Sequence, residues 1–402
     1  MKNELLNWCR TGDYQRDNFD KFLKAVKFSF KVPSVHITGS NGKGSTAHFL
    51  EMSYINAGYK VGSFTSPYLY EINELIKVNN SPISDDDFQK IYKEYEKQFK
   101  KFDLSEFEVE TFIAFTYFTQ SKCDICFIEC GMGGAFDATN VFDPILCVIT
   151  SVSLEHTAYL GKTVAEIAYH KAGIFRDEVP VVVGKINEEA ELAILEAASE
   201  HRTKIHRIVD PAKLTLTNKG YSFSYEVYPD IVVNNFADYI VDDACIALEC
   251  INYIKDQFPI SIENIQAGFA SDTLTARMTV LSKDNHIIID GAHNPEGCYK
   301  LAQTIMSRFD GNNFHIVFAC FRDKNLERML ANLGQITNKI TLTSFPHERC
   351  RNEDDYFLFL GEYEYNGDVI NLVKNLRENY PDDYVLITGS LAFAGYMLDM
   401  LK

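Results

Sequence analysis

The sequence lacks the features that mark membrane, secreted and nucleic-acid-binding proteins. No apolar run approaches the roughly 20 residues that a helix needs to span a bilayer, and residues 1–4 contain no apolar signal core. Basic residues are scarce, with 39 Lys and Arg against 56 Asp and Glu and a formal net charge of −17. Because affinity for a phosphate backbone comes from clustered Lys and Arg, this deficit argues against a nucleic-acid partner. We therefore expect a cytoplasmic protein with no membrane or nucleic-acid partner.

The sequence also lacks the paired cysteines of a zinc site. Cys123, Cys126 and Cys130 lie in one apolar stretch, and no second pair follows at zinc-site spacing. As a strand, this stretch places Cys126 and Cys130 on one face and Phe127 and Glu129 on the other. We expect the cysteines to be reduced and to pack as small, buried apolar side chains.

The chain is long enough for two α/β domains. Its 402 residues exceed the usual size of one domain, about 100–200 residues. Short β-branched runs alternate with helical patterns from residue 35 onward, which is typical of a mostly parallel, doubly wound sheet. A second α/β series begins near residue 278. We predict a first domain over residues 1–273 and a smaller Rossmann-like domain over residues 274–402.

Periodicity and turn residues locate the individual elements. The predicted strands cover residues 35–37, 60–64, 125–129, 145–150, 179–183, 286–289, 314–318, 340–343 and 384–388. The predicted helices cover residues 45–57, 85–99, 108–119, 164–173, 238–254 and 261–269. In residues 204–233 short β runs alternate with turn residues, which predicts a small antiparallel excursion.

The strongest local signal is a glycine-rich loop, HITGSNGKGST, that leaves a predicted strand and opens a predicted helix at residues 36–46. Loop amides can approach a polyphosphate, the helix N-terminus favours negative charge, and Lys43 can reach the outer phosphates. Either Ser45 or Thr46 can then meet Mg²⁺ or a phosphate oxygen. The loop departs from the ordinary P-loop pattern, because Ile37 stands five residues before Gly42. We predict that ATP is bound by Gly39, Asn41, Gly42, Lys43, Gly44, Ser45 and Thr46.

Several segments resemble the Mur ligase superfamily, and within it the folylpolyglutamate synthase and dihydrofolate synthase branch. The loop TGSNGKGST at residues 38–46 is similar to the nucleotide loop of this family, and FTSPYL at 64–69 is similar to its Thr-Ser-Pro-His-Leu loop. Further matches in order are IKVNNSPIS (76–84), ECGMGG (129–134), DATN (137–140), SLEHT (153–157), HKAGI (170–174), DGAHNP (290–295) and TGSL (388–391). The resemblance spans nearly the whole chain. It implies an ATP-dependent ligase that adds glutamate to a folate-type acceptor.

Metal ligands are suggested partly by position and partly by the resemblance. Glu129 ends an apolar strand beside a glycine-rich turn, where a carboxylate can hold Mg²⁺. The resemblance implies that Ser66 and His156 complete the ligands for two Mg²⁺ ions. It also implies that Lys171 is carbamylated, which would turn a cation into an anion that helps to hold the second ion.

The second domain has a strand-to-helix corner of its own. Asp290 follows a predicted strand, and the next residues, Asn294 and Pro295, can cap and begin a helix. The resemblance implies that Asp290 binds the nucleotide ribose, while Arg277 and His293 approach the phosphates. Ser390, at another such corner, is a further candidate for the nucleotide or glutamate side.

The implied reaction activates a carboxylate, which alone is a poor electrophile. Transfer of the ATP γ-phosphoryl group gives an acyl phosphate that the glutamate amine attacks, with Lys43, Lys171 and His293 as the expected catalytic residues.

The identity of the acceptor stays open, because the family pattern is changed at Tyr68, Leu75, Ala135 and Glu155. Two alternatives are an amide ligase for a non-folate acid and an ATP-binding regulatory protein without catalysis. We expect a monomer whose partners are ATP, glutamate and folate or dihydropteroate.

Overall fold

The computed structural model describes residues 6–9, 15–271 and 274–401, and the chain forms two compact units. The first unit comprises residues 1–216, 222–233 and 241–271, and the second comprises residues 217–221, 234–240 and 272–402. Thr273, the last residue of the predicted first domain, lies outside the described residues, as do residues 1–4. The predicted domain division stays a prediction.

The first unit is built on an eight-stranded sheet in the order β4-β3-β2-β5-β1-β6-β7-β8. Its strands pair in parallel except at one edge, where β3 runs antiparallel to both β2 and β4. This confirms the predicted mostly parallel sheet. The strands are β1 (Ser34–Thr38), β2 (Val61–Phe64), β3 (Ile76–Val78), β4 (Ser81–Pro82), β5 (Ile125–Glu129), β6 (Leu146–Ile149), β7 (Val181–Val183) and β8 (Ile205–Arg207).

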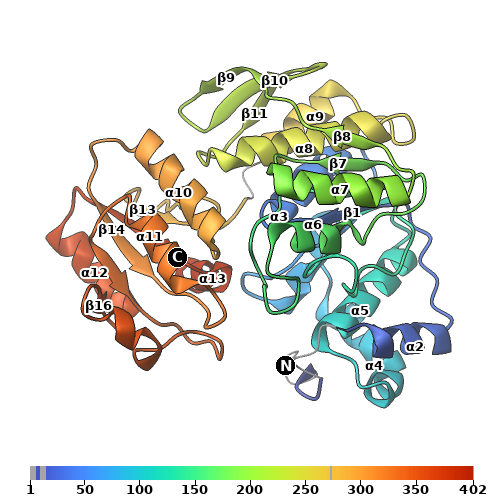
Figure 1. Ribbon diagram of the computed structural model, residues 1–402, viewed down its shortest axis with the longest axis horizontal. Helices are drawn as coiled ribbons and strands as arrows, with labels where there is room; N and C mark the ends of the chain where they lie inside the picture. The colour runs from blue at the N-terminus through green and yellow to red at the C-terminus, as the bar shows by residue number, and fades with distance from the viewer. Residues whose placement is uncertain (1–5, 10–14, 272–273, 402) are drawn as a thin grey trace. The chain divides into compact units, whose positions relative to one another are not determined.

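Helices cover both faces of this sheet (Figure 1). Phe127 of β5 contacts Tyr54 of α3 on one face, with ring centroids 5.8 Å apart. Cys126 and Ile128 pack into an apolar core with α4 and α5 on the other, as the predicted alternation requires. The helices of this unit are α2 (Asp17–Ala25), α3 (Lys43–Asn56), α4 (Asp85–Lys101), α5 (Glu106–Ser121), α6 (Val164–Ala172), α7 (Glu188–Glu200), α8 (Tyr239–Ile254) and α9 (Ile262–Phe269), with a 3₁₀ turn η1 (Ile72–Leu75). The first two residues of α8, Tyr239 and Ile240, belong to the second unit.

Side-chain caps determine where several helices begin. Ser105 accepts a hydrogen bond from the Glu108 amide, and the Glu108 carboxylate accepts one from the Ser105 amide, so α5 begins two residues earlier than predicted. Thr163 and Glu166 form the same reciprocal box at α6.

Within the described ranges, no helix is long and apolar enough to cross a bilayer.

Residues 204–233 form an excursion that was only partly predicted. Strands β9 (Ala212–Leu216), β10 (Tyr221–Tyr225) and β11 (Tyr228–Val233) make a separate three-stranded sheet. The two-residue connection between β10 and β11 requires an antiparallel pair. The start of the segment was assigned wrongly, because β8 pairs in parallel with β7 and extends the large sheet.

The second unit contains a six-stranded sheet in the order β12-β13-β17-β14-β15-β16. It is parallel apart from the edge pair of β12 and β13, which confirms the predicted second α/β series. Its strands are β12 (Thr279–Val280), β13 (Ile287–Ile289), β14 (Phe314–Phe318), β15 (Ile340–Leu342), β16 (Glu364–Tyr365) and β17 (Tyr384–Thr388). Its helices are α10 (Pro295–Arg308), α11 (Leu326–Leu333), α12 (Val369–Asn379) and α13 (Leu391–Met400), with a 3₁₀ helix η2 (Asp354–Phe359).

Candidate functional site

The glycine-rich loop lies where predicted, between β1 and α3. Strand β1 is central, with β5 and β6 as its parallel neighbours, so the segments that follow these three strands meet at one edge of the sheet. In the register of β1 and β5, Ile37 stands opposite Glu129. The loop and the acidic end of β5 are therefore neighbours because of the sheet, although about ninety residues separate them in the sequence.

Two glycines allow the loop to follow its path. Gly42 has φ +88°, and a Cβ there would lie 2.2 Å from Oδ1 of Asp243 on α8. Gly39 has φ +153°, and a Cβ there would lie 1.9 Å from Oγ1 of Thr150. Both positions therefore require glycine, because a side chain would be strained and would collide with these neighbours.

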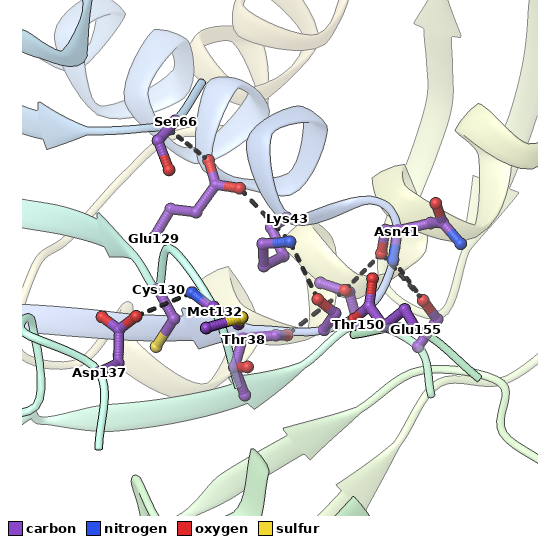
Figure 2. Close-up of polar contacts among 12 residues, drawn as sticks. Thr38, Asn41, Lys43, Ser66, Glu129, Cys130, Met132, Asp137, Thr150 and Glu155 are labelled. Carbon is purple, nitrogen blue, oxygen red and sulfur yellow. Dashed lines mark hydrogen bonds and ion pairs between the residues drawn. The ribbon is translucent and has the colours of Figure 1, made fainter. Parts of the chain in front are cut away.

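The segment after β6 holds the loop from one side. Thr150 Oγ1 donates to the Asn41 carbonyl oxygen at 2.6 Å (Figure 2). The Asn41 amide donates to Ser151 Oγ at 2.9 Å. Asn41, predicted to bind ATP, is thus anchored through its backbone. Its side chain is not needed for these two bonds.

Lys43 and Glu129 lie together at the centre of the candidate site. Lys43 Nζ is 3.7 Å from Glu129 Oε1 and donates to the Gly39 carbonyl oxygen at 2.9 Å. The Ser66 amide donates to Glu129 Oε2 at 3.1 Å, so Figure 2 shows the carboxylate between Ser66 and Lys43. The side chain of Glu129 is only 4% exposed. The arrangement supplies one buried carboxylate and one cation beside a loop of backbone amides.

The two hydroxyl residues that open α3 differ in their surroundings. Thr46 is fully buried and its Oγ1 donates to the Asp243 carbonyl oxygen at 3.5 Å. Ser45 Oγ is buried without a hydrogen-bond partner among the described residues. Because buried hydroxyls are normally satisfied, this geometry favours Ser45 over Thr46 as the group that meets Mg²⁺ or a phosphate oxygen.

The side-chain oxygens next to the loop are of the kind that bind a hard divalent cation. They are the Glu129 carboxylate, the unpartnered Ser45 hydroxyl and the neighbouring Ser66, and Mg²⁺ prefers oxygen ligands. In the described part of the chain, no group of three or more His, Cys, Asp and Glu side chains is gathered at metal-binding distance. The structure thus brings Ser66 to Glu129 but does not gather His156 into such a cluster with them.

Lys171, near the end of α6, forms a buried ion pair. Its Nζ is 2.8 Å from Glu155 Oε1, and the two side chains are 1% and 8% exposed. Burial lowers the pKa of Lys171, although Glu155 opposes this shift. Burial alone would raise the pKa of Glu155, but the charges of Lys171, Lys43 and His156 hold it well below its ordinary value. Glu155 is therefore ionised, and it favours the ammonium form of Lys171.

The predicted nucleotide residues of the second unit have internal partners. Asp290 is 2% exposed, and its Oδ1 accepts from the Ala292 amide at 2.8 Å. Its Oδ2 accepts from the Met278 amide at 2.9 Å and from the Tyr239 hydroxyl at 2.6 Å. Asp290 is thus a hydrogen-bond centre of this unit, a role that the motif alone did not reveal.

The other three predicted residues of this unit lie at turns and helix starts. Arg277 Nη1 donates to the Ala276 carbonyl oxygen at 3.1 Å, and His293 Nδ1 is 3.0 Å from the Gly291 carbonyl oxygen. Ser390 stands at the N-cap of α13 and is 2% exposed, but its side chain makes no capping hydrogen bond. Their roles toward a ligand stay predictions.

Sequence reasoning missed three residues around these groups. Asp243 lies against Gly42, Thr150 bonds the loop, and Tyr239 bonds Asp290. No motif marks Asp243 or Tyr239, because each belongs to a long apolar helix far from its partner in sequence. A polar residue that interrupts an apolar helical face was the only available signal.

Comparisons with known proteins give one consistent result. The Mur ligase middle domain matches residues 37–208, and the Mur ligase glutamate ligase domain matches residues 276–391. The dihydrofolate synthase/folylpolyglutamate synthase of Bacillus subtilis is 32% identical over 391 residues, covering 92% of this chain and 91% of the relative. The folylpolyglutamate synthase of Lacticaseibacillus casei is 30% identical over 376 residues, covering 90% and 88%.

Solved structures agree over the whole chain. The folylpolyglutamate synthase of Mycobacterium tuberculosis, solved with ADP and AMPPCP, aligns with a TM-score of 0.90 and 25% identity, covering 99% of this chain and 97% of that one. A folylpolyglutamate synthase complex with AMPPCP and folate aligns with a TM-score of 0.87 and 27% identity, covering 100% and 98%.

Proposed function

Because this chain belongs to the dihydrofolate synthase and folylpolyglutamate synthase family of the Mur ligases and is an ATP-dependent ligase, we propose that its candidate site joins glutamate to a folate-type acid. The observation that carries the proposal is the Lys43–Glu129 pair beside the glycine-rich loop, with the unpartnered Ser45 hydroxyl next to it. Relatives that bind AMPPCP, folate and related ligands support the substrate class.

The loop and Lys43 would act on the phosphates of ATP. Loop amides and the N-terminus of α3 attract the polyphosphate, while Lys43 leaves the Gly39 carbonyl for the γ-phosphoryl group. The acceptor carboxylate then attacks the γ-phosphorus, which forms the acyl phosphate and releases ADP. The glutamate amine attacks the acyl carbon, expels phosphate and loses a proton, so that an amide bond remains. Lys43 stabilises the charge of the transferring group.

We propose that Glu129, Ser66 and Ser45 hold one Mg²⁺ ion and that His156 helps to hold a second. When bound, Mg²⁺ neutralises the charge that develops on the phosphoryl oxygens. The residues of the chain contribute oxygen donors and a buried position that excludes water. Removing Mg²⁺ with a chelator should abolish ATP turnover, and competition by Ca²⁺ for the same oxygens should lower it.

Carbamylation of Lys171 stays part of this proposal. Burial lowers the pKa of Lys171, which increases the fraction of neutral amine that can attack CO₂. Glu155 would face an anion after the reaction, so the carbamate requires a nearby cation to offset this repulsion. A ¹³C resonance of a carbamate that appears with ¹³C-bicarbonate and Mg²⁺, and is absent from Lys171→Ala, is the expected result. Partial rescue of that variant by short-chain carboxylic acids would agree with it.

In the second unit, we propose that Asp290 contacts the ribose, that Arg277 and His293 contact the phosphates, and that Ser390 serves the nucleotide or glutamate. The carboxylate of Asp290 has about four acceptor positions, and three hydrogen bonds occupy it in this structure. This leaves one acceptor position for a ribose hydroxyl. We further propose that the protein acts as a cytoplasmic monomer on small-molecule substrates.

The decisive experiment measures phosphate release with ATP, Mg²⁺ and glutamate in the presence of dihydropteroate, tetrahydrofolate, both or neither. We expect stimulation by at least one acceptor and its conversion to a glutamylated product. Folded protein that binds ATP but responds to neither acceptor would contradict the folate assignment and favour another acid or a regulatory role. Lys43→Ala should abolish turnover without unfolding the protein, whereas Lys90→Ala, on an exposed helix surface, should not change it.

A further inference from the structure

Arg277 lies in a backbone turn that is unfavourable by itself. The residues on either side, Ala276 and Met278, have φ values of 59° and 49°. Non-glycine residues seldom adopt this left-handed conformation, and two of them around one arginine need support from outside the turn. The conformation that presents Arg277 therefore depends on the groups that bond to this turn.

Groups of the second unit bond to the turn at both of its flanking residues. The Met278 amide donates to Asp290 Oδ2 at 2.9 Å. The Ala276 carbonyl oxygen accepts from the Gly291 amide at 2.8 Å, and the Ala276 amide donates to Thr279 Oγ1 at 2.9 Å. These bonds join the turn to the end of β13 and the start of β12.

Two further bonds come from the connector, which we define as residues 234–240. Asn235 Nδ2 donates to the Arg277 carbonyl oxygen at 2.7 Å, and Asn235 is 7% exposed. The Tyr239 hydroxyl donates to Asp290 Oδ2 at 2.6 Å, the same oxygen that receives the Met278 amide. Both donors are about forty or more residues from their partners in sequence. The connector thus holds the turn directly through Asn235 and indirectly through Asp290.

We propose that Asn235 and Tyr239 are positioning residues that set the Arg277 turn for the nucleotide, Asn235 directly and Tyr239 through Asp290. Neither needs to touch ATP. The inference rests on the nucleotide role proposed above for Arg277. It predicts that losing either connector bond disorders Arg277 and so weakens nucleotide binding. The residues that carry out the chemical step are not affected.

Tyr239→Phe tests the proposal, because it removes the hydroxyl bond and keeps the ring. We expect the KM for ATP to rise about three- to tenfold while kcat stays within about twofold, as for loss of one typical hydrogen bond. Tyr365→Phe is the matched control, since the Tyr365 hydroxyl bonds to Ser344 Oγ at 2.9 Å on β16, at the opposite edge of the same sheet from β12 and β13. It should lower the thermal midpoint comparably and leave the KM for ATP unchanged.

A double-mutant cycle with Arg277→Ala separates this inference from the proposed function. If Tyr239 acts through Arg277, Tyr239→Phe adds less than twofold to the KM for ATP in the Arg277→Ala background. Asn235→Ala should behave in the same way, which gives a second variant if one of them folds poorly. An unchanged KM in Tyr239→Phe and Asn235→Ala, or effects that add fully to Arg277→Ala, would overturn the inference alone. An unchanged KM in Arg277→Ala would overturn it together with the nucleotide role of Arg277.

Discussion

Replacing Glu155 by Gln should destabilise the protein strongly, because it leaves the ammonium group of Lys171 buried without its counter-charge. The two side chains are 8% and 1% exposed, and their charged atoms are 2.8 Å apart. Removing one partner of a buried pair costs about 3–5 kcal/mol, whereas replacing both with apolar groups is often nearly neutral. We therefore expect Glu155→Gln to lower the free energy of unfolding at pH 7 by about 3–5 kcal/mol.

The loss should become smaller as the pH rises. Burial already lowers the pKa of Lys171, and removal of Glu155 takes away the charge that opposes this shift. The unfolded chain then binds more protons than the folded chain in the pH range between the two pKa values of Lys171. Stability rises with pH under that condition, so the deficit of Glu155→Gln should be larger at pH 7 than at pH 9.

The assay is urea unfolding, in buffer free of CO₂, of the wild type, Glu155→Gln, Lys171→Met and the double variant. We expect the double variant to be more stable than Glu155→Gln, with a coupling energy of about 2 kcal/mol or more. A loss of under about 1 kcal/mol in Glu155→Gln, or simple additivity in the cycle, would refute a stabilising buried pair. Equal losses at pH 7 and pH 9 would refute the assigned charge of Lys171.

Three further predictions follow from buried groups. Burial lowers the pKa of His36 to about 3, so neutral His36 contributes stability that is present above pH 6.5 and lost as the pH falls. Between pH 7 and pH 5, the free energy of unfolding in urea should fall by about 2 kcal/mol more for the wild type than for His36→Gln, and equal falls would contradict this. Gly268→Ala should cost about 1–3 kcal/mol in thermal unfolding, because a Cβ there would lie 2.5 Å from the Ser53 amide nitrogen, while Gly361→Ala in open space should change little. Ser45→Ala should keep its unfolding free energy within about 0.5 kcal/mol but lower Mg²⁺-dependent ATP turnover, and normal turnover would exclude Ser45 as a ligand.

Much of the fold follows from local patterns in the sequence. The strands at residues 125–129, 314–318 and 384–388 have the predicted bounds, because each is a short and mostly apolar run. Strand β8 was misplaced, since its three residues carry no signal that distinguishes a parallel partner from a hairpin partner. Its pairing is decided by β7, which lies more than twenty residues earlier.

The candidate site, like the fold, could be predicted only in part. The phosphate loop and Glu129 could be predicted together, because parallel strands bring their carboxyl ends to one edge of a sheet. The contacts of Asp243 with Gly42 and of Tyr239 with Asp290 could not, since they depend on how α8 packs. Sequence motifs mark residues whose neighbours lie within a few positions, whereas these partners are joined only by tertiary packing.

The charge balance around the loop gives an argument for a divalent cation that does not depend on any relative. The chain has a formal charge of −17, so ATP must be held by local groups rather than by the overall field. Lys43 lies 3.7 Å from Glu129, and Lys171 lies 2.8 Å from Glu155, so each of these lysines is matched by a carboxylate. These four side chains are together neutral, so they add no net positive charge to the backbone amides of the loop. A bound Mg²⁺ would add the missing positive charge next to Glu129, and it would release Lys43 to follow the phosphoryl group.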